Sequence, residues 1–118
     1  MYSKEYVVKS NETSLEVGSG NLKVLATPIL VAYMENAAMS HAASLLDEGQ
    51  TTVGSFIQID HLAPSAVGAQ IKVTIDGFKQ DGRLLSYSIQ AYQGDTLVGR
   101  AQHQRAIVDA ERFMTKIK

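Results

Sequence analysis

The sequence predicts an α+β fold in which an antiparallel sheet wraps around one long helix. The first supporting observation is an apolar stretch from Thr27 to Leu46 whose residues favour helix throughout. The second is a change of period from Thr51 onward, where apolar and polar residues alternate as they do in half-buried strands. One helix beside a sheet buries most apolar surface when the sheet curls around it.

The predicted helix should begin at Thr27, a good N-cap residue, with Pro28 in the first helical position. Gly49 follows its end and is expected to cap it. The helix is apolar on almost every side, so other parts of the fold should surround it. Glu35 lies in its middle, on an apolar face. A carboxylate there must find a partner, stay protonated or face a functional site.

Five strands are predicted, one before the helix and four after it. Residues 4–8 form the first, and the others cover residues 51–61, 71–76, 85–91 and 97–108. The sequence QDGR at residues 80–83 is a hairpin signal, and residues 93–95 form another turn. We therefore expect the last four strands to pair in sequence as an antiparallel meander. No linker or repeat divides residues 1–118, which predicts a single domain.

Composition narrows the classes of function. The chain has 118 residues, 45% hydrophobic and 19% charged, as in an ordinary soluble domain. Its formal net charge of -1 gives no reason to expect a nucleic-acid or anionic-membrane partner. The chain contains no cysteine, so disulfides, thiolate metal sites and a cysteine nucleophile are excluded. Without an apolar signal core or a suitable span, we expect a cytoplasmic protein.

Three residues are candidates for chemistry, each with a structural alternative. Glu35 is either a buried acid satisfied by a neighbouring donor or a general base. His61 ends an apolar strand row and is either a packed histidine or a group that transfers protons with an acid on the facing helix. Thr27 is explained by helix capping, although the start of a helix also stabilises a developing oxyanion.

Further polar residues lie in the strands. Gly54 is either a bulge or a place where a ligand approaches the backbone. His103 and Arg105 share a strand row with apolar residues, which indicates a polar pocket, a subunit contact or solvated strand ends. His41 is expected to be an ordinary helix residue. The three histidines have no metal-binding spacing, so no metal site is predicted.

A sheet curled around one helix is the arrangement of the hotdog fold. The chain resembles the single-domain hotdog thioesterases, most closely the fluoroacetyl-CoA thioesterase type, from about Leu25 to Phe113. The resemblance rests on an ordered set of motifs: Thr27 followed by Glu35 in YMENAAM, then TVGSF, IDHLAPSAVG, DGRLLSYSIQAYQG and GRAQHQRAIVDAERF.

The resemblance implies that Thr27, Glu35 and His61 form an active site and that Gly54 and Arg105 contact the substrate. The implied reaction is hydrolysis of an acyl-CoA thioester to the free acid and CoA. By the same resemblance we expect a homodimer with its sites at the interface. We expect no metal or other cofactor, since CoA arrives with the substrate.

The segment before the helix, residues 17–25, lacks the aromatic lid residues of the fluoroacetyl-CoA enzyme. We therefore expect a general acyl-CoA thioesterase. Three alternatives remain open at the level of sequence. They are an acyl-CoA-binding hotdog protein without turnover, acting as a sensor or subunit; a dehydratase of hydroxyacyl thioesters; and a domain whose polar core residues are only structural.

Overall fold

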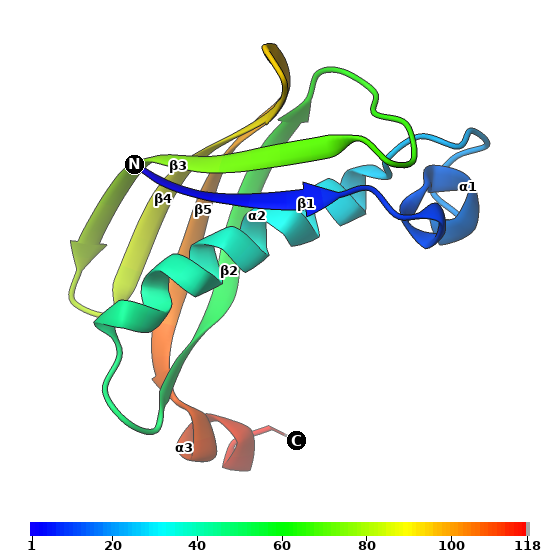
Figure 1. Cartoon of the computed structure of the whole chain (residues 1–118). Coiled ribbons are helices and arrows are strands. Elements are labelled where there is room, and N and C mark those ends of the chain that lie inside the picture. Colours follow the sequence, from blue (N-terminus) through cyan, green and yellow to red (C-terminus); the bar gives the residue numbers. More distant parts are fainter. Residues whose placement is uncertain (118) are drawn as a thin grey trace.

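The computed structural model describes residues 1–117, which form a five-stranded antiparallel sheet with one long helix across one face (Figure 1). The strands are β1 (Tyr2–Val7), β2 (Gln50–His61), β3 (Gln70–Asp81), β4 (Leu84–Gln93) and β5 (Thr96–Asp109). Their order in the sheet is β1-β3-β4-β5-β2. The predicted α+β class, with its antiparallel sheet and long helix, is confirmed.

The predicted four-strand meander is only partly right. β3, β4 and β5 pair in sequence through turns at Gly82 and Gly94, where φ is 62° and 57°. β2, however, pairs with β5 at one edge of the sheet, and β1 pairs with β3 at the other. The reason is the connection between β2 and β3, residues 62–69, which is too long for a tight hairpin and crosses the sheet to place β3 beside β1. β2 is consequently an edge strand.

Helix α2 (Thr27–Ala42) differs from the expectation at both ends. Ala26 is the N-cap, Thr27 is already helical, and no side chain caps the first turn, so the predicted capping by Thr27 is wrong. The helix ends at Ala42 and continues as the 3₁₀ turn η2 (Ala43–Leu45). Gly49 does not cap it; with φ 83° it forms the turn into β2.

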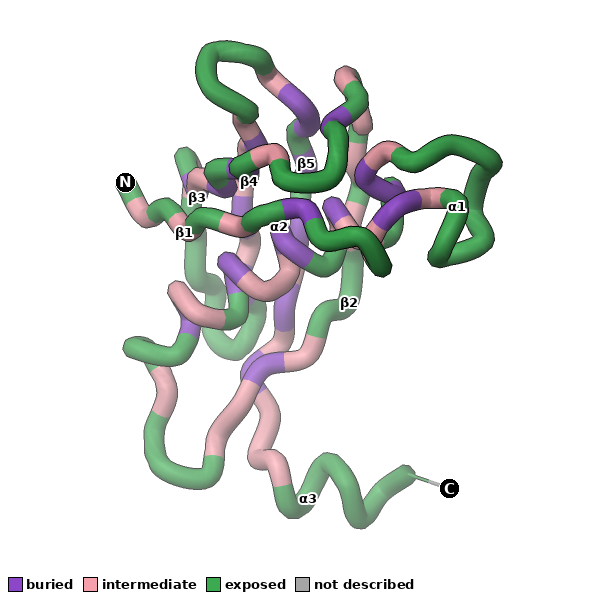
Figure 2. Tube along the Cα trace, turned by 45° about the vertical axis from the view of Figure 1, so that its right-hand side comes forward, coloured by how far each residue is buried: buried purple, intermediate pink, exposed green. Residues whose placement is uncertain are grey.

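The core lies between α2 and the sheet, where the buried segments gather in Figure 2. From α2 it takes Leu30, Tyr33, Met34, Ala37, Ala38 and Ala42. Inward-facing residues of β3, β4 and β5 alternate with exposed or half-buried ones, as the period of two predicts. The opposite side of α2 is left partly uncovered, and Met39 there is 44% exposed. This chain by itself therefore covers only one side of the helix.

Short elements complete the chain. The 3₁₀ turn η1 (Ser10–Glu12) and helix α1 (Ser14–Val17) lie between β1 and α2, and helix α3 (Ala110–Thr115) follows β5. Both short helices are largely exposed (Figure 2). The segment before α2 is held by backbone bonds to the β2–β3 connection, including Leu25 N–H to the Ser65 carbonyl at 2.8 Å. These bonds place the first turn of α2 beside the end of β2.

Candidate active site

The first turn of α2 and the last residue of β2 form one half of the candidate site. Thr27 Oγ1 and His61 Nδ1 lie 2.8 Å apart. The Thr27 hydroxyl is available for this contact because Ala26, and not Thr27, is the N-cap of α2. The two side chains line an open pocket of about 350 Å³ together with residues of the α1–α2 and β2–β3 segments. A hydroxyl beside an imidazole is the arrangement that activates an oxygen nucleophile.

His61 is suited to accept a proton. Burial lowers the pKa of His61 below its usual value, although the backbone of Ala63 opposes the shift. The ring is therefore neutral near neutral pH. Its Nε2 atom is buried without a hydrogen-bond partner. Because Nε2 is enclosed, Nδ1, which contacts the Thr27 hydroxyl, is the ring nitrogen placed to accept a proton.

Glu35 belongs to a second cluster, two helix turns further along α2. It faces the point where the register of β2 shifts, between Gly54 and Phe56. A Cβ atom built on Gly54 would lie 2.7 Å from Glu35 Oε2 and 3.5 Å from Arg105 Nη1. The absence of a side chain at Gly54 thus lets the Glu35 carboxylate approach the backbone of β2 closely, beside the guanidinium of Arg105.

Arg105 is buried, with only 6% of its surface exposed, and hydrogen bonds fix its guanidinium in this cluster. Its Nε donates to Thr52 Oγ1 at 2.9 Å and its Nη2 donates to the Thr52 carbonyl at 3.1 Å. Burial lowers the pKa of Arg105, and the charge of Glu35 opposes this shift. Within residues 1–117 the two ion pairs are Arg83–Asp109 and Arg100–Asp60, so Arg105 has no carboxylate within ion-pair distance.

The five predicted site residues are thus brought together as two groups, not one. Thr27 and His61 form a pair, and Glu35, Gly54 and Arg105 form a cluster. Thr27 and Glu35 are separated by ~12 Å along the helix axis, since the rise is about 1.5 Å per residue. Within one chain the two groups therefore cannot act on the same atom.

Two more residues belong to this cluster: His103, for which the sequence left a polar pocket open as one of three readings, and Thr52, which the sequence did not indicate. His103 is 1% exposed and its Nε2 lies 3.2 Å from Arg105 Nη1, and Thr52 holds the other side of Arg105. The parity of His103 with buried residues of β5 was a signal, but it was equally compatible with a solvated strand end. The alternating pattern of β2 did not indicate that Thr52 faces inward, because the register shift between Gly54 and Phe56 reverses which side of the strand faces the core.

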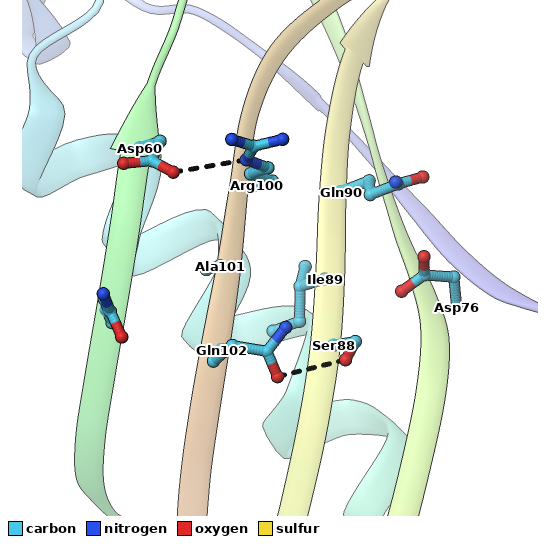
Figure 3. Close-up of a pocket in the computed structure, with 9 residues that line it drawn as sticks. Asp60, Asp76, Ser88, Ile89, Gln90, Arg100, Ala101 and Gln102 are labelled. Atoms are coloured by element: carbon cyan, nitrogen blue, oxygen red, sulfur yellow. Dashed lines mark hydrogen bonds and ion pairs between the residues drawn. The ribbon is translucent and has the colours of Figure 1, made fainter.

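The opposite face of the sheet carries a polar hollow of about 290 Å³ (Figure 3). Arg100 Nε donates to Asp60 Oδ2 at 3.2 Å, and Ser88 Oγ donates to Gln102 Oε1 at 3.1 Å. The charged pair is 62% and 59% exposed, so solvent screens it. None of the predicted site residues lines this hollow, which we regard as ordinary sheet surface.

Within residues 1–117, no group of three or more His, Asp or Glu side chains is arranged to hold a metal ion. No helix in this part of the chain combines the length and hydrophobicity that a membrane span requires.

Comparison with known proteins assigns the family. The family of fluoroacetyl-CoA-specific thioesterases matches residues 8–111. A fluoroacetyl-CoA thioesterase from Streptantibioticus cattleyicolor is 31% identical over 96 residues, which cover 81% of this chain and 69% of that protein.

Solved structures agree with this assignment. A variant of the fluoroacetyl-CoA-specific thioesterase in complex with fluoroacetate and CoA has a TM-score of 0.92 at 27% identity, covering 98% of this chain and 95% of that one. A thioesterase superfamily member from Thermus thermophilus has a TM-score of 0.87 at 25% identity, covering 97% and 85%. The chain therefore has the hotdog fold and belongs to the family of fluoroacetyl-CoA-specific thioesterases.

Proposed function

We propose that this thioesterase hydrolyses an acyl-CoA thioester with Thr27, Glu35 and His61. The observation that carries the proposal is the 2.8 Å contact between the Thr27 hydroxyl and a neutral histidine. The Glu35 carboxylate beside Gly54 supports it.

In this mechanism His61 acts as the base. It takes a proton from the Thr27 hydroxyl, or from a water held by that hydroxyl, and the resulting oxygen attacks the thioester carbonyl. The C–S bond then breaks, and His61 returns the proton to the CoA sulfur. If the attacking oxygen is that of Thr27, the acyl group is left as an ester on Thr27, and a water activated by His61 then cleaves this ester to release the free acid and restore the hydroxyl. Glu35 orients the attacking group and Arg105 lies beside the substrate. Backbone N–H groups at the start of α2 or near Gly54 hold the oxyanion.

We further propose that the working enzyme is a homodimer. β2 has an unpaired edge, and Phe56 on it is 48% exposed. The neighbouring side of α2 carries Met39, which is 44% exposed. An exposed apolar edge strand invites pairing with another chain, and the commonest symmetric solution is a twofold dimer. A second copy of this chain is therefore our proposed occupant of the β2 edge.

Dimerisation through β2 also offers a way to unite the two halves of the site. Opposite residues in an antiparallel pair have numbers with a constant sum. A twofold axis near Ile57 and Gln58 would therefore set His61 of one chain opposite Gly54 of the other. Each site would then combine Thr27 and His61 from one chain with Glu35 and Arg105 from its partner.

The activity is tested by thiol release from a panel of short, branched, aromatic and fluorinated acyl-CoAs. We expect turnover by the wild type and at least a ~100-fold loss in Glu35→Gln and His61→Ala, with folding retained by circular dichroism. Saturable binding without turnover would instead identify an acyl-CoA sensor. An unsaturated product from a hydroxyacyl-CoA would identify a dehydratase.

The composite site is tested by mixing the two inactive variants. If each site uses both chains, a mixed dimer keeps one intact site. Random mixing should then restore about a quarter of the wild-type activity, because half of the dimers are mixed and each has one of two sites intact. If each site lies within one chain, the mixture stays inactive.

The acyl specificity that we propose is broader than that of the named relatives. Residues 17–25, before α2, contain no aromatic side chain that could close over a small acyl group. We propose that the enzyme works in the cytoplasm and needs no metal or redox cofactor, since the three side chains supply the nucleophile and the proton transfers. Turnover should therefore be unchanged by a chelator, and loss of turnover on chelation would refute this part.

A further inference from the structure

His103, on β5, makes two hydrogen bonds that together define its protonation state. Its Nδ1 lies 2.7 Å from the Phe56 carbonyl, which can only accept, so Nδ1 carries the proton. Its Nε2 lies 3.2 Å from Arg105 Nη1, which can only donate, so Nε2 must be free to accept. Both bonds are satisfied only by the neutral ring with its proton on Nδ1.

Arg105 depends on this ring for its orientation. Thr52 accepts from two nitrogens of the guanidinium, Nε and Nη2, and His103 accepts from the third, Nη1. Because Arg105 is buried, losing one acceptor would leave a charged donor without a partner, which is costly in low dielectric surroundings. The guanidinium would be expected to rotate or move towards a new acceptor.

His103 fixes the direction of Arg105 Nη1, and this nitrogen is the one that lies nearest to Gly54. The space left by the missing side chain of Gly54 is bordered by Glu35 Oε2, Arg105 Nη1 and His103 Cε1. The nitrogen that His103 holds is thus the same nitrogen that faces Glu35 and Gly54. The Phe56 carbonyl that anchors His103 lies just beyond the register shift of β2.

We propose that His103 is a positioning residue, which fixes Nη1 of Arg105 towards Glu35 and the backbone at Gly54. The inference rests on the proposed function, because it gives Arg105 a place beside the substrate. His103 does not touch the reacting atoms itself. It acts through Arg105, and only as the neutral ring, since protonation of Nε2 would remove the acceptor and oppose two cations.

The surroundings of His103 keep it neutral. Burial is the main cause that lowers the pKa of His103, and Arg105 also lowers it. The Phe56 carbonyl and Glu35 act in the opposite direction. Tyr87 of β4 lies with its ring centroid 6.5 Å away. The groups facing the ring from α2, β2, β4 and β5 are therefore Glu35, the Phe56 carbonyl, Tyr87 and Arg105.

The kinetic test compares His103→Leu, which removes the acceptor, with His103→Gln, which keeps one near Nε2. We expect kcat/KM of the Leu variant to fall by about 10- to 100-fold, the range for losing one hydrogen bond to a charged group. The Gln variant should recover most of this loss. Ile75→Val, a buried change two strands away on β3, controls for general destabilisation and should keep wild-type kinetics.

A double variant separates positioning from direct action. Because His103 acts through Arg105, adding His103→Leu to Arg105→Met should lower kcat/KM no further than Arg105→Met alone. Multiplicative losses in the double variant would overturn the proposal. Equal losses in the Leu and Gln variants would overturn it as well.

A readout independent of turnover uses nitrogen-15 NMR of the histidine rings. The spectrum of the wild type should show His103 with its proton on Nδ1 from neutral pH to well below pH 6.5, the ordinary pKa of a histidine. A proton on Nε2, or a ring that titrates normally, would contradict the positioning role. If the wild type hydrolyses no acyl-CoA, the proposed function fails, whereas this spectrum still decides the geometry of His103.

Discussion

At the scale of single residues, two glycines on the neighbouring strands β2 and β5 lack a side chain for different reasons. Gly54 leaves room beside Glu35 and Arg105, whereas Gly99 on β5 is enclosed by apolar side chains and backbone. A Cβ at Gly99 would lie 2.9 Å from Leu30 Cδ2 and 3.0 Å from the Asp60 carbonyl. Contacts with backbone are hard to relieve, while the end of the Glu35 side chain can move.

We therefore predict that Gly54→Ala lowers turnover at least ~10-fold without a marked loss of stability, because the new methyl displaces the Glu35 carboxylate. Gly99→Ala is the matched comparison and should destabilise the fold by about 1–3 kcal/mol through overpacking. Thiol release and thermal unfolding of both variants give the result. A stable Gly54→Ala enzyme with full activity would show that Gly54 is not part of the site.

Thr27 provides a second prediction at this scale. Since its hydroxyl contacts His61 and does not cap α2, Thr27→Ala should change the free energy of unfolding by less than ~0.5 kcal/mol, not by the ~1 kcal/mol typical of a lost cap. Turnover should fall sharply in this variant. Thr27→Ser keeps the hydroxyl and should retain most of the activity. Urea unfolding that shows a full capping loss for Thr27→Ala would contradict the assignment.

The sequence indicates the residues of the candidate site, but it does not indicate their contacts. Thr27, Glu35 and His61 were identified by motif and spacing, whereas the bond between Thr27 and His61 depends on a backbone position one residue earlier than expected. A cap at Ala26 leaves no side-chain signature, because alanine has no group that could accept a hydrogen bond. The role of Thr52 was hidden by the register shift beside Gly54.

At the scale of elements, β2 is the strand that carries residues of both groups of the candidate site. Its end carries His61, its middle carries Gly54, and its outer edge is unpaired within residues 1–117. The strand itself was predicted from its period of two, but its partner was not. Alternation is a local property, whereas pairing with β5 is decided by the path of the connection to β3. The same reason explains why β1 was predicted without its partner.

We predict that Phe56→Glu, on this edge, shifts the protein from dimer to monomer and abolishes most turnover, because a charge there opposes pairing of two strands. Val7→Glu is the control. Val7 is 49% exposed on β1, the opposite edge, and the same change should leave the dimer intact. Analytical ultracentrifugation gives both answers. A monomeric wild type, or a dimeric Phe56→Glu with full activity, would refute the proposed interface.

At the scale of the whole molecule, all three histidines are held in environments that disfavour their charged form. Burial lowers the pKa of His41, His61 and His103 below the ordinary 6.5. His41 lies among aromatic rings and its Nδ1 is 3.0 Å from the Tyr87 hydroxyl. At a pH between each folded pKa and 6.5, the unfolded chain binds more protons than the folded one. Acid therefore favours unfolding.

Accordingly, the melting temperature should be highest above the unfolded histidine pKa and should fall as the pH drops below about 6.5 towards the lowered pKa values of the folded state. Differential scanning calorimetry across this range measures the slope. His41→Gln, which removes one of the three titrations away from the proposed chemistry, should make the slope shallower. A melting temperature that rises as the pH falls through this range would show that the predicted direction of the pH dependence is wrong.

The strand order also has a consequence for how the chain folds. β3, β4 and β5 follow one another through tight turns, while Tyr2 must find Ile75 and Gln50 must find Asp109. Distant pairs form only after a long loop has closed, at a cost in chain entropy that local hairpins avoid. The three-strand meander is therefore the natural nucleus, and β2 joins it late. A refolding molecule should regain most of its sheet before it regains any activity.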